Sequence, residues 1–464
     1  MRILIDFVYL LAALAYSPII IYRAIRHKRY RTGWAQRFGK ITRKDRALKK
    51  CIWLHAVSVG EVNAARTIIE ELEIRFPDFE IVISTTTDTG FARANALFGE
   101  NLHVFYFPFD LSWVMRRAFH KIRPAICLLM EQEVWPNFVH LAQQLEVPVV
   151  VVNGRISDKS FARYKKVKTI AKMIWQKVTL VLAQTDEYAQ RFITIGAPAE
   201  KVIVTGSLKY DTAQTEDKVE GADALAAQLD ISCHCEPEQS EGVAISKPTE
   251  EIASVAPLPR NDAIEGERLW VAGATGPGEE KIILDVFTNL TAQQQFNNLR
   301  LVIVPRKPER FDEVAQLIED AGFDFVRYST IKNTDAECPE KTPVILGDTM
   351  GDLRKFYSLA TIIFVGRSLV PMGGSDMMEA AALGKCTLFG PHAFNFRQTV
   401  DALIEDEGAI MVKDEQELLQ TMQKCLSEPD FAQKIARSGR QVIRKNQGAT
   451  TKTIEQIAIF LKSA

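Results

Sequence analysis

Several charged residues in this sequence directly follow short apolar runs, and a parallel sheet would place such residues at the carboxyl ends of its strands. Glu61 stands in Ser58-Val59-Gly60-Glu61, after a run that ends at Val57. In the first turn of a following helix, its carboxylate would be favoured by the helix dipole and kept ionised, as a general base requires. The alternative is an acid that only complements the dipole, and position alone favours that alternative.

Two more groups of charged residues follow apolar runs in the same half of the chain. Residues 131–137 read Glu-Gln-Glu-Val-Trp-Pro-Asn and place two acids, Glu131 and Glu133, at the end of one run. Lys209 lies in Gly206-Ser207-Leu208-Lys209 after another run. A solvated acidic turn and a solvated lysine are the alternatives. A lysine in a cleft, however, can compensate the charge of a phosphate.

The second half of the chain contains a strand pattern, a glycine-rich turn and a helix pattern in succession. Residues 365–369 read VGRSL, residues 371–376 read PMGGSD, and residues 377–385 read MMEAAALGK. The free backbone N–H groups and the positive end of such a helix would hold a phosphate. Glu379, about one turn into the helix, could accept hydrogen bonds from ribose hydroxyls. This pattern favours nucleotide binding over a simple turn.

Two further loops in this half follow apolar runs. Residues 305–310 read PRKPER, in which Arg306 is a natural partner for an anion, and residues 347–353 read GDTMGDL. The groups suited to phosphate and ribose therefore occur in the second half of the chain, and the candidate acid–base groups occur in the first.

Several enzyme classes lack their motifs here. No G-x-G-x-x-G follows a predicted strand, and no H-E-x-x-H occurs. Residues 273–278 have the glycine spacing of a P-loop, but Glu279-Glu280 replace the lysine and hydroxyl residue and would repel phosphates. No two aspartates are two positions apart, which removes the D-x-D pair that often brings a divalent metal to a sugar diphosphate. We therefore predict no metal site.

The elements that position these residues follow from the alternation of short apolar runs with amphipathic stretches. In the first half the runs are 51–57, 80–87, 125–130, 147–154, 178–185 and 201–206. In the second half they are 268–275, 301–305, 342–348, 361–366, 386–391 and 408–412, and helical patterns follow at 415–427 and 450–462. Continuous apolar strands separated by helices indicate parallel sheets covered on both faces. The sequence predicts two doubly wound α/β domains facing a cleft, with ligands at the carboxyl ends of the strands.

Residues 212–265 interrupt this alternation. They are polar, contain several prolines and show no usable period, which is typical of a linker or a disordered insert. Cys233-His234-Cys235 lies inside this segment, but a zinc site needs a second ligand pair at suitable spacing and none is nearby.

Composition limits the class of protein. A chain of 464 residues is long enough for two to four domains. Lys and Arg total 57 and Asp and Glu total 58, so the net charge of −1 argues against nucleic acid as a partner. The seven cysteines are an odd, scattered set and predict reduced thiols of a cytosolic protein.

The N-terminus departs from this balance. Ile3 to Tyr22 is about as long as a helix that crosses a bilayer, although Asp6 and Pro18 interrupt it. Residues 23–40 contain seven Lys and Arg and no acid, so the positive-inside rule places the following chain in the cytoplasm. Near anionic lipid, each such residue contributes about 1 kcal/mol. We expect an inner-membrane anchor or a monotopic helix. A buried or interfacial helix is the first alternative, and a cleaved signal peptide, which would carry its charge before the apolar run, is the second.

Several longer motifs closely resemble those of the 3-deoxy-D-manno-octulosonic acid (Kdo) transferases of Gram-negative bacteria. They are SVGEV, MEQEVWPN, GSLKYD, VPRKPERF, GDTMGDL and FVGRSLVPMGGSDMMEAAALGK followed by FGPHAFNFR. The resemblance spans the chain except the segment near 212–265. It implies an inverting glycosyltransferase of the GT-B type that moves Kdo from CMP-Kdo to a lipid A precursor, lipid IVA, at the cytoplasmic face of the inner membrane. It implies no cofactor besides this donor substrate.

The resemblance also implies roles for individual residues. It makes Glu61 the base that deprotonates the acceptor hydroxyl, and it makes Glu131 and Lys209 groups that stabilise the transition state. The positions that match the family's CMP contacts are Pro305, Arg306, Met350, Gly351, Asp352, Asp376, Met377, Met378 and Glu379. CMP leaves with a single phosphate, so arginine, lysine and a helix N-terminus could stabilise it without a metal.

The implied domains are an anchor at 1–22, an acceptor-binding domain at 23–211, the insert at 212–265, a CMP-sugar-binding domain at 266–445 and a C-terminal helix at 446–464. Two rivals remain open. One is another enzyme of this architecture that uses UDP, such as a sugar transferase or an epimerase. The other is a membrane-tethered nucleotide-binding protein without turnover.

Two motifs depart from the family pattern. Ala274-Thr275-Gly276 stands where many members have Ser-Thr-His, so any donor contact from that histidine is absent. Residues 373–379 read GGSDMME against the usual G-G-H-N-P-L-E, so Asp376 places a negative charge near the CMP phosphate unless it contacts the base or the ribose.

Overall fold

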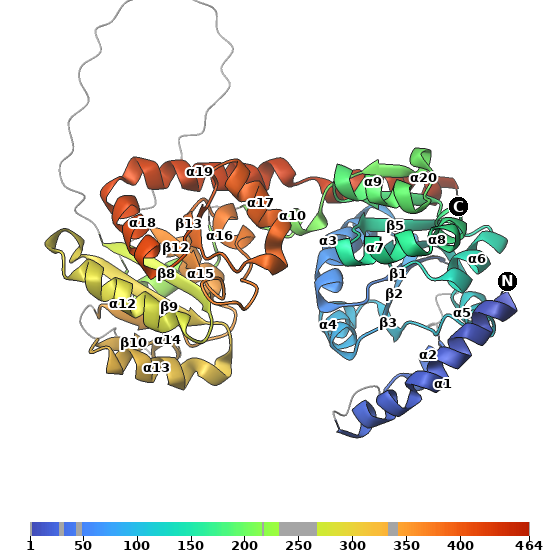
Figure 1. Ribbon diagram of the computed structural model, residues 1–464, viewed down its shortest axis with the longest axis horizontal. Helices are drawn as coiled ribbons and strands as arrows, with labels where there is room; N and C mark the ends of the chain where they lie inside the picture. The colour runs from blue at the N-terminus through green and yellow to red at the C-terminus, as the bar shows by residue number, and fades with distance from the viewer. Residues whose placement is uncertain are drawn as a thin grey trace, which may run out of the picture. The chain divides into compact units, whose positions relative to one another are not determined.

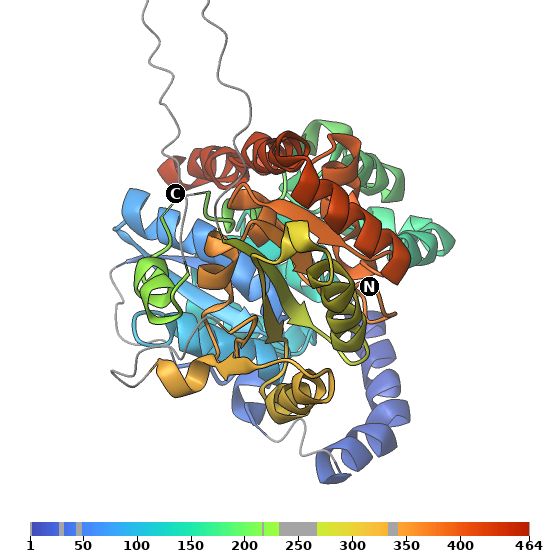
Figure 2. The same cartoon turned by 90° about the vertical axis from the view of Figure 1, so that its left-hand side faces the viewer.

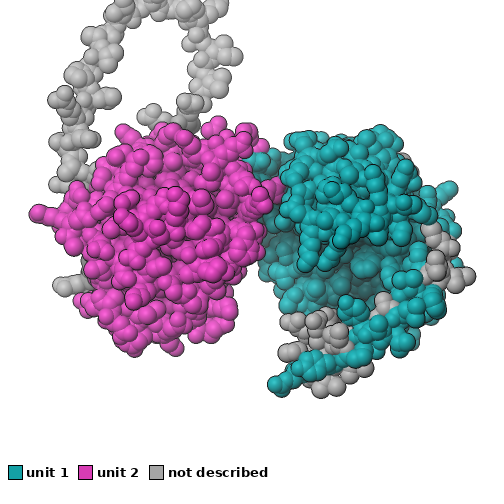
Figure 3. All heavy atoms as spheres, in the orientation of Figure 1, with its two compact units in different colours: residues 1–212, 446–464 teal, residues 213–445 magenta. Residues whose placement is uncertain are grey.

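The chain forms two compact units, each built around one sheet (Figures 1 and 3). The computed structural model describes residues 2–26, 32–42, 49–215, 218–231, 267–332 and 342–463. Unit 1 consists of Met1–Thr212 and Asn446–Ala464, and unit 2 of Ala213–Lys445. The expected pair of parallel-sheet α/β domains is therefore confirmed.

The sheet of unit 1 has seven strands in the order β3-β2-β1-β4-β5-β6-β7, and each pair of neighbouring strands is parallel. The strands are β1 (Lys50–His55), β2 (Phe79–Thr85), β3 (His103–Tyr106), β4 (Pro124–Met130), β5 (Val149–Gly154), β6 (Leu180–Ala183) and β7 (Val202–Val204). The chain moves outward from β1 to β3 and then returns to the other side of β1. The strand order therefore reverses between β1 and β4, where an α/β sheet opens a crevice for ligands.

Helices cover both faces of this sheet. They are α3 (Val59–Arg75), α4 (Asp88–Phe98), α5 (Ser112–Ile122), α6 (Pro136–Gln144), α7 (Asp158–Lys166), α8 (Lys168–Trp175), α9 (Asp186–Ile195), α10 (Leu208–Asp211) and α20 (Ala449–Ser463). On one face Trp53 packs edge-on against Phe119 and Phe138, with ring centroids 5.3 and 5.1 Å away. The other face buries Leu54 together with Ile457 of α20. Burial on both faces explains why the strands are continuous apolar runs.

The C-terminal helix belongs to unit 1 and is not a separate element. The predicted helix at 450–462 is confirmed as α20, which packs against α3 and α10. Asp211 caps its start by accepting hydrogen bonds from the backbone of Gly448, at 2.7 Å, and of Thr450. At the predicted boundary, residue 446, the chain therefore passes from unit 2 back to unit 1.

The N-terminal helix α1 (Arg2–Arg26) contains Pro18 and contacts α5 and α6. Asp6 accepts hydrogen bonds from the backbone of Ser112 and from the side-chain amide of Asn137, both at 2.9 Å. Within the described part of the chain, no helix combines the length and the apolar character needed to cross a membrane. Arg37, in the short α2 (Trp34–Arg37), is buried and donates to the Thr86 carbonyl, so this member of the basic segment is not available to lipid.

Unit 2 repeats the architecture of unit 1, and helices lie on both faces of its sheet (Figure 2). The strand order is β10-β11-β9-β8-β12-β13-β14. The strands are β8 (Arg268–Thr275), β9 (Leu299–Pro305), β10 (Phe325–Arg327), β11 (Val344–Leu346), β12 (Ile362–Val365), β13 (Cys386–Phe389) and β14 (Ile410–Met411). The order reverses between β8 and β12, which therefore flank the crevice of this sheet.

The helices of unit 2 include the predicted segment 415–427, which is confirmed as α18 with the same bounds. They are α11 (Ala222–Gln228), α12 (Glu279–Thr291), α13 (Phe311–Asp320), α14 (Tyr328–Ile331), α15 (Leu353–Leu359), α16 (Met378–Ala382), α17 (Arg397–Glu405), α18 (Glu415–Ser427) and α19 (Pro429–Asn446). Strands β3 and β10 correspond to none of the apolar runs in the sequence and are a finding of the structure.

The prediction that residues 212–265 form an insert is wrong for their first part. Leu225 and Leu229 are buried, and residues 218–231 include α11. Arg300 also donates to the carbonyl of Leu229 at 3.1 Å, which attaches this segment to unit 2. Residues 232–266, with the Cys233-His234-Cys235 triplet, lie outside the described residues.

Candidate active site

The first group of candidate residues lies at the strand-order reversal of unit 1. Glu61 follows β1 and Glu131 follows β4, and these two strands are neighbours in the sheet. Ser58 begins α3, and its hydroxyl accepts a hydrogen bond from the Glu61 backbone at 3.4 Å. The Glu61 carboxylate accepts from the Ser58 hydroxyl at 2.8 Å and from the Val57 backbone at 2.9 Å. The geometry is close to a capping box, so Glu61 also stabilises the start of its helix.

Burial sets the protonation of Glu61. The residue is 9% exposed, and burial raises the pKa of its carboxyl to about 7. The hydrogen bonds from Val57 and Ser58 lower this pKa, and the nearby carboxylate of Glu131 raises it. Burial therefore opposes the ionisation that the helix terminus favours. A pKa near 7 suits a group that must take a proton at neutral pH.

Glu131 lies close enough to this carboxylate to raise its pKa, and Lys209 lies near Glu131. Glu131 has a φ of 55°, in the left-handed region that side chains rarely adopt, which is typical of functional sites. Burial raises the pKa of the Glu131 carboxyl, and the positive charges of Arg155 and Lys209 oppose that rise. The structure thus brings together Glu61, Glu131 and Lys209, and it adds Arg155. Arg155 is not among the residues expected from the sequence, although it directly follows strand β5.

The second group of candidates lies in unit 2, at the carboxyl ends of its strands. The turn after β12 contains Gly373 and Gly374 with φ of 92° and 79°, as a tight glycine turn requires. A Cβ on Gly374 would lie 2.9 Å from the Cα of Ala393, so a side chain would not fit there. Asp376 then accepts a hydrogen bond from the Met378 backbone at 3.0 Å, at the start of the five-residue helix α16.

Glu379 in α16 lies among charges from three other segments. Burial raises the pKa of its carboxyl, Arg354 and Arg306 lower it, and Asp376 raises it. Arg306 follows β9, and its backbone donates to the Thr275 carbonyl at 3.1 Å. Arg354 lies in α15 and is not among the residues expected from the sequence. Two cations and a partly buried carboxyl at this edge could bind the phosphate and the sugar hydroxyls of a nucleotide.

Other predicted nucleotide contacts have structural partners. Asp352 forms ion pairs with Lys332 at 2.5 Å and Lys355 at 2.9 Å. Burial opposes ionisation of Asp352, but its bonds to Lys332, Thr349 and Lys355 outweigh burial and lower its pKa. This carboxylate therefore holds the start of α15 in place.

The remaining predicted contacts differ in exposure. The Met350 side chain is exposed, and the next residue, Gly351, has a φ of 94°. Met377 and Met378 are buried, so a ligand could meet only their backbone. Pro305 ends β9 and is also buried.

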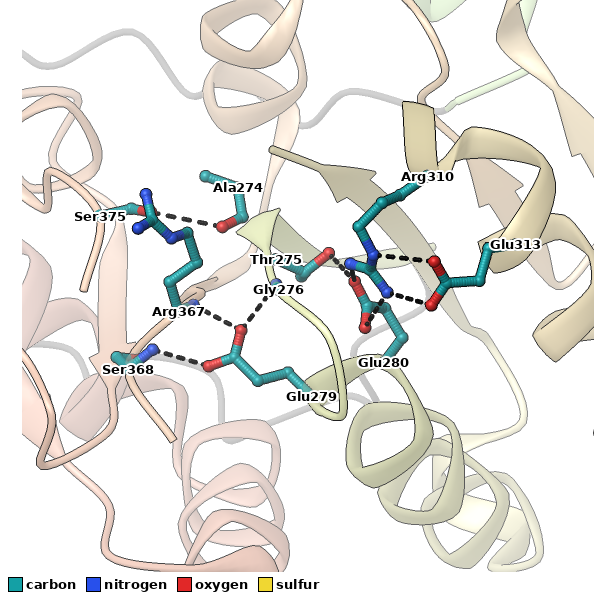
Figure 4. A network of polar contacts seen from close by, with 10 residues as sticks. All are labelled: Ala274, Thr275, Gly276, Glu279, Glu280, Arg310, Glu313, Arg367, Ser368 and Ser375. Carbon is teal, nitrogen blue, oxygen red and sulfur yellow. Dashed lines mark hydrogen bonds and ion pairs between the residues drawn. The ribbon is translucent and has the colours of Figure 1, made fainter. Parts of the chain in front are cut away.

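Glu279 and Glu280, which stand where a P-loop has its lysine and hydroxyl residue, form hydrogen bonds and an ion pair inside unit 2 (Figure 4). Glu280 is fully buried, pairs with Arg310 at 2.5 Å and accepts from the Thr275 hydroxyl at 2.8 Å. Glu279 is fully buried and accepts hydrogen bonds from four backbone N–H groups, those of Gly276, Arg367, Ser368 and Leu369. Across the described ranges, no three His, Cys, Asp or Glu side chains gather as a metal ion would require.

The sequence of this chain is similar to those of known Kdo transferases. Residues 32–212 match the family model described as 3-deoxy-D-manno-octulosonic-acid transferase (kdotransferase). The 3-deoxy-D-manno-octulosonic acid transferase of Haemophilus influenzae is 32% identical over 441 residues, which are 95% of this chain and 94% of that protein. The enzyme of the same name from Bordetella pertussis is 30% identical over 466 residues, 98% and 99% of the two chains.

A solved glycosyltransferase structure from Rickettsia africae has the same fold. It matches with a TM-score of 0.53 at 14% identity and covers 89% of this chain and 98% of that one. At this identity the likeness concerns the fold alone, and it confirms the GT-B-like class. From the extent and identity of the sequence matches, the chain belongs to the 3-deoxy-D-manno-octulosonic acid (Kdo) transferase family, whose members are glycosyltransferases.

Proposed function

We propose that this protein is an inverting transferase that moves Kdo from CMP-Kdo to lipid IVA, a lipid A precursor, in lipopolysaccharide biosynthesis, with Glu61 as the general base. The observation that carries the proposal is the buried Glu61 carboxyl, whose pKa is about 7 at the strand-order reversal of unit 1. Such a group accepts a proton at neutral pH and gives it up again after the reaction.

In the proposed reaction, the acceptor hydroxyl transfers its proton to Glu61 while its oxygen attacks the anomeric carbon of Kdo. The bond from that carbon to the phosphate oxygen of CMP breaks, and CMP leaves with the bonding electrons. Arg306 and Arg354 of unit 2 are suited to compensate the charge on the single phosphate, so no metal is required in this proposal. Lys209, beside Glu131, supplies a further positive charge in unit 1.

We also propose that the protein works at the cytoplasmic face of the inner membrane. Among the described side chains of α1, large hydrophobic ones are exposed, namely Phe7, Val8, Leu10, Leu11, Leu14, Tyr16 and Tyr22. Exposed apolar patches of this kind are typical of membrane or protein contacts, and the lipid acceptor makes a membrane the fitting partner. Asp6 ties the same helix to α5 and α6, which would hold unit 1 near the lipid surface.

The deciding experiment incubates the full chain with CMP-Kdo and lipid IVA and analyses the products by mass spectrometry. We expect CMP release and lipid IVA carrying added Kdo, with an inverted anomeric configuration by NMR. CMP binding without CMP release would support a binding protein instead, and equal or tighter binding of UDP would support the rival nucleotide-sugar enzyme.

A pair of variants tests the base assignment. Glu61→Ala should abolish transfer and leave CMP binding largely intact, because Glu61 lies in unit 1 and the nucleotide candidates lie in unit 2. Glu70→Ala, an exposed acid on the same helix, is the matched control and should keep full activity. Loss of CMP binding in Glu61→Ala would show that the base assignment is wrong.

A further inference from the structure

Arg367 is a cation in an unusual backbone conformation at the strand-order reversal of unit 2. It follows β12, the neighbour of β8, and its φ is 59°. Ala274, near the end of β8, has a φ of 55°. Side-chain-bearing residues adopt such angles at a cost of about 1 kcal/mol or more, and they keep them where the surroundings impose them. Two such residues therefore flank the crevice of this sheet.

Glu279 imposes the conformation of Arg367. Its buried carboxylate accepts hydrogen bonds from the backbone of Arg367 and, at 2.7 Å, from that of Ser368. The Arg367 carbonyl in turn accepts from the Gly374 backbone at 2.7 Å. The backbone of Arg367 is thus held on both sides, and the direction of its side chain is fixed by the fold.

Gly276 makes room for this side chain. A Cβ on Gly276 would lie 3.0 Å from the Cγ of Arg367 and 2.7 Å from the Sδ of Met372. The aliphatic part of Arg367 therefore passes over the glycine, and the guanidinium extends away from the Glu279 carboxylate (Figure 4). The absence of a side chain at position 276 is what allows this path.

The guanidinium has little to compensate its charge. Its Nη2 donates to the Met372 carbonyl at 3.2 Å, and the side chain is only partly buried. Throughout the ranges that the structure describes, no carboxylate pairs with it. The negative charge nearest to its backbone, on Glu279, is already shared among four N–H groups. A fixed arginine of this kind is suited to bind an external anion with its planar fork of donors.

We propose that Arg367 binds an anionic group of the donor, either its phosphate or the carboxylate of its sugar. This inference rests on the proposed function, which supplies a donor that carries both groups. Arg367 then helps to determine which donor is bound. Gly276 leaves the space that the Arg367 side chain needs to reach the crevice.

The test is Arg367→Gly, studied with isothermal titration of CMP, CMP-Kdo and cytidine. Glycine prefers the φ of this position, so the variant should fold and its thermal midpoint should be unchanged or higher. The matched control is Arg123→Gly, which removes another arginine of positive φ, exposed in unit 1, and should leave every affinity unchanged. Arg367→Lys keeps a positive charge and should lose less affinity than Arg367→Gly.

We expect Arg367→Gly to weaken CMP-Kdo binding about tenfold or more, as loss of a charged hydrogen bond does. An equal loss for CMP identifies the phosphate as the partner, and a loss confined to CMP-Kdo identifies the sugar carboxylate. Cytidine binding should not change. Wild-type affinity of Arg367→Gly for CMP-Kdo would overturn the inference and leave the proposed function intact. Failure of the unaltered protein to bind CMP-Kdo would instead overturn the proposed function, and this inference with it.

Discussion

At Glu61, the proposed role in catalysis and the stability of the fold place opposite demands on one carboxyl group. Its pKa rises from the ordinary 4.5 to about 7 on folding, chiefly through burial. Below pH 4.5 the group is protonated in both the folded and the unfolded chain, so it does not affect stability. As the pH rises from 4.5 through 7, the unfolded chain loses the proton first, and the ionised, buried form destabilises the fold. The proposed base is therefore kept at the expense of folding free energy.

Replacing this carboxyl by an amide should separate the two effects. Glu61→Gln should abolish transfer and increase the free energy of unfolding at pH 8 by on the order of 1 to 3 kcal/mol, because no charge remains to be buried. At pH 3, well below the pKa of the unfolded chain, the increase should vanish. Urea unfolding at the two pH values measures this, with exposed Glu70→Gln as the control. Equal effects at both pH values would contradict the assigned cause.

Ser58 should tune the pH dependence of activity. Its hydroxyl bonds to the Glu61 carboxylate and lowers the pKa of that group, so Ser58→Ala should raise this pKa further. The proposed base must be deprotonated to accept a proton, and the acid limb of kcat/KM should therefore move to higher pH. The control is Ser157→Ala, which removes the comparable cap of α7. Both variants should lose about 1 kcal/mol of stability. A shift of the limb in the control, or none in Ser58→Ala, would refute this role.

The sequence predicts the site residues that directly follow strands. Glu61, Glu131 and Arg306 stand after apolar runs, and a parallel sheet brings the ends of neighbouring strands to one edge. Arg354 lies within α15 and reaches the same edge only through packing. The raised pKa of Glu61 also depends on burial by residues distant in sequence, so no local pattern reports it.

At the scale of elements, the sequence predicts helices and strands best when they are long and when a capping residue marks their ends. Helix α18 begins where Asp414 caps it, and its bounds agree with the helical pattern read from the sequence. Strands β3 and β10 have four and three residues and lie at the edges of their sheets. A segment of three or four residues is too short to show a clear alternation of apolar and polar residues. The strand beside it therefore determines its conformation.

The attachment of α20 to unit 1 should depend on Asp211. Its carboxylate caps α20 through the backbone of Gly448 and Thr450, and α20 contributes Ile454 and Ile457 to the core. Asp211→Ala leaves these N–H groups without their acceptor and should reduce the free energy of unfolding by about 1 to 2 kcal/mol. Amide exchange should show faster opening of α20 in particular. Asp285→Ala, an exposed aspartate of α12, serves as the control. Uniform destabilisation without faster exchange in α20 would argue against this capping role.

At the scale of the whole molecule, the order of segments along the chain does not reveal the units. Residues 446–464 follow unit 2 in sequence but pack with unit 1, where Thr450 hydrogen-bonds to Thr67 across 383 positions. A helical pattern identifies the helix but not the sheet that it covers. The partner is chosen by the shape and apolar surface of a face assembled from distant parts of the chain.

Shortening the segment between Ile231 and Glu267 would test whether the fold of unit 2 and the transfer reaction need these residues. One nitrogen, Nη1 of Arg300, donates both to the Asp230 carbonyl at 3.1 Å and to the Glu267 carboxylate at 2.8 Å. The chain therefore leaves and re-enters unit 2 at nearly the same place, and a short bridge can join these ends without moving either one.

Replacing residues 233–264 by Gly-Ser-Gly-Ser should leave both fold and transfer intact. Cutting a loop of about 35 residues to about 7 should add about 1 kcal/mol to the free energy of unfolding, because closing a shorter loop costs less entropy. Urea unfolding and CMP release measure the two outcomes. Arg300→Met in the shortened chain should remove the gain, since it breaks the link between the two ends. A folded but inactive product would show that the excised segment takes part in the reaction and is not only a connection.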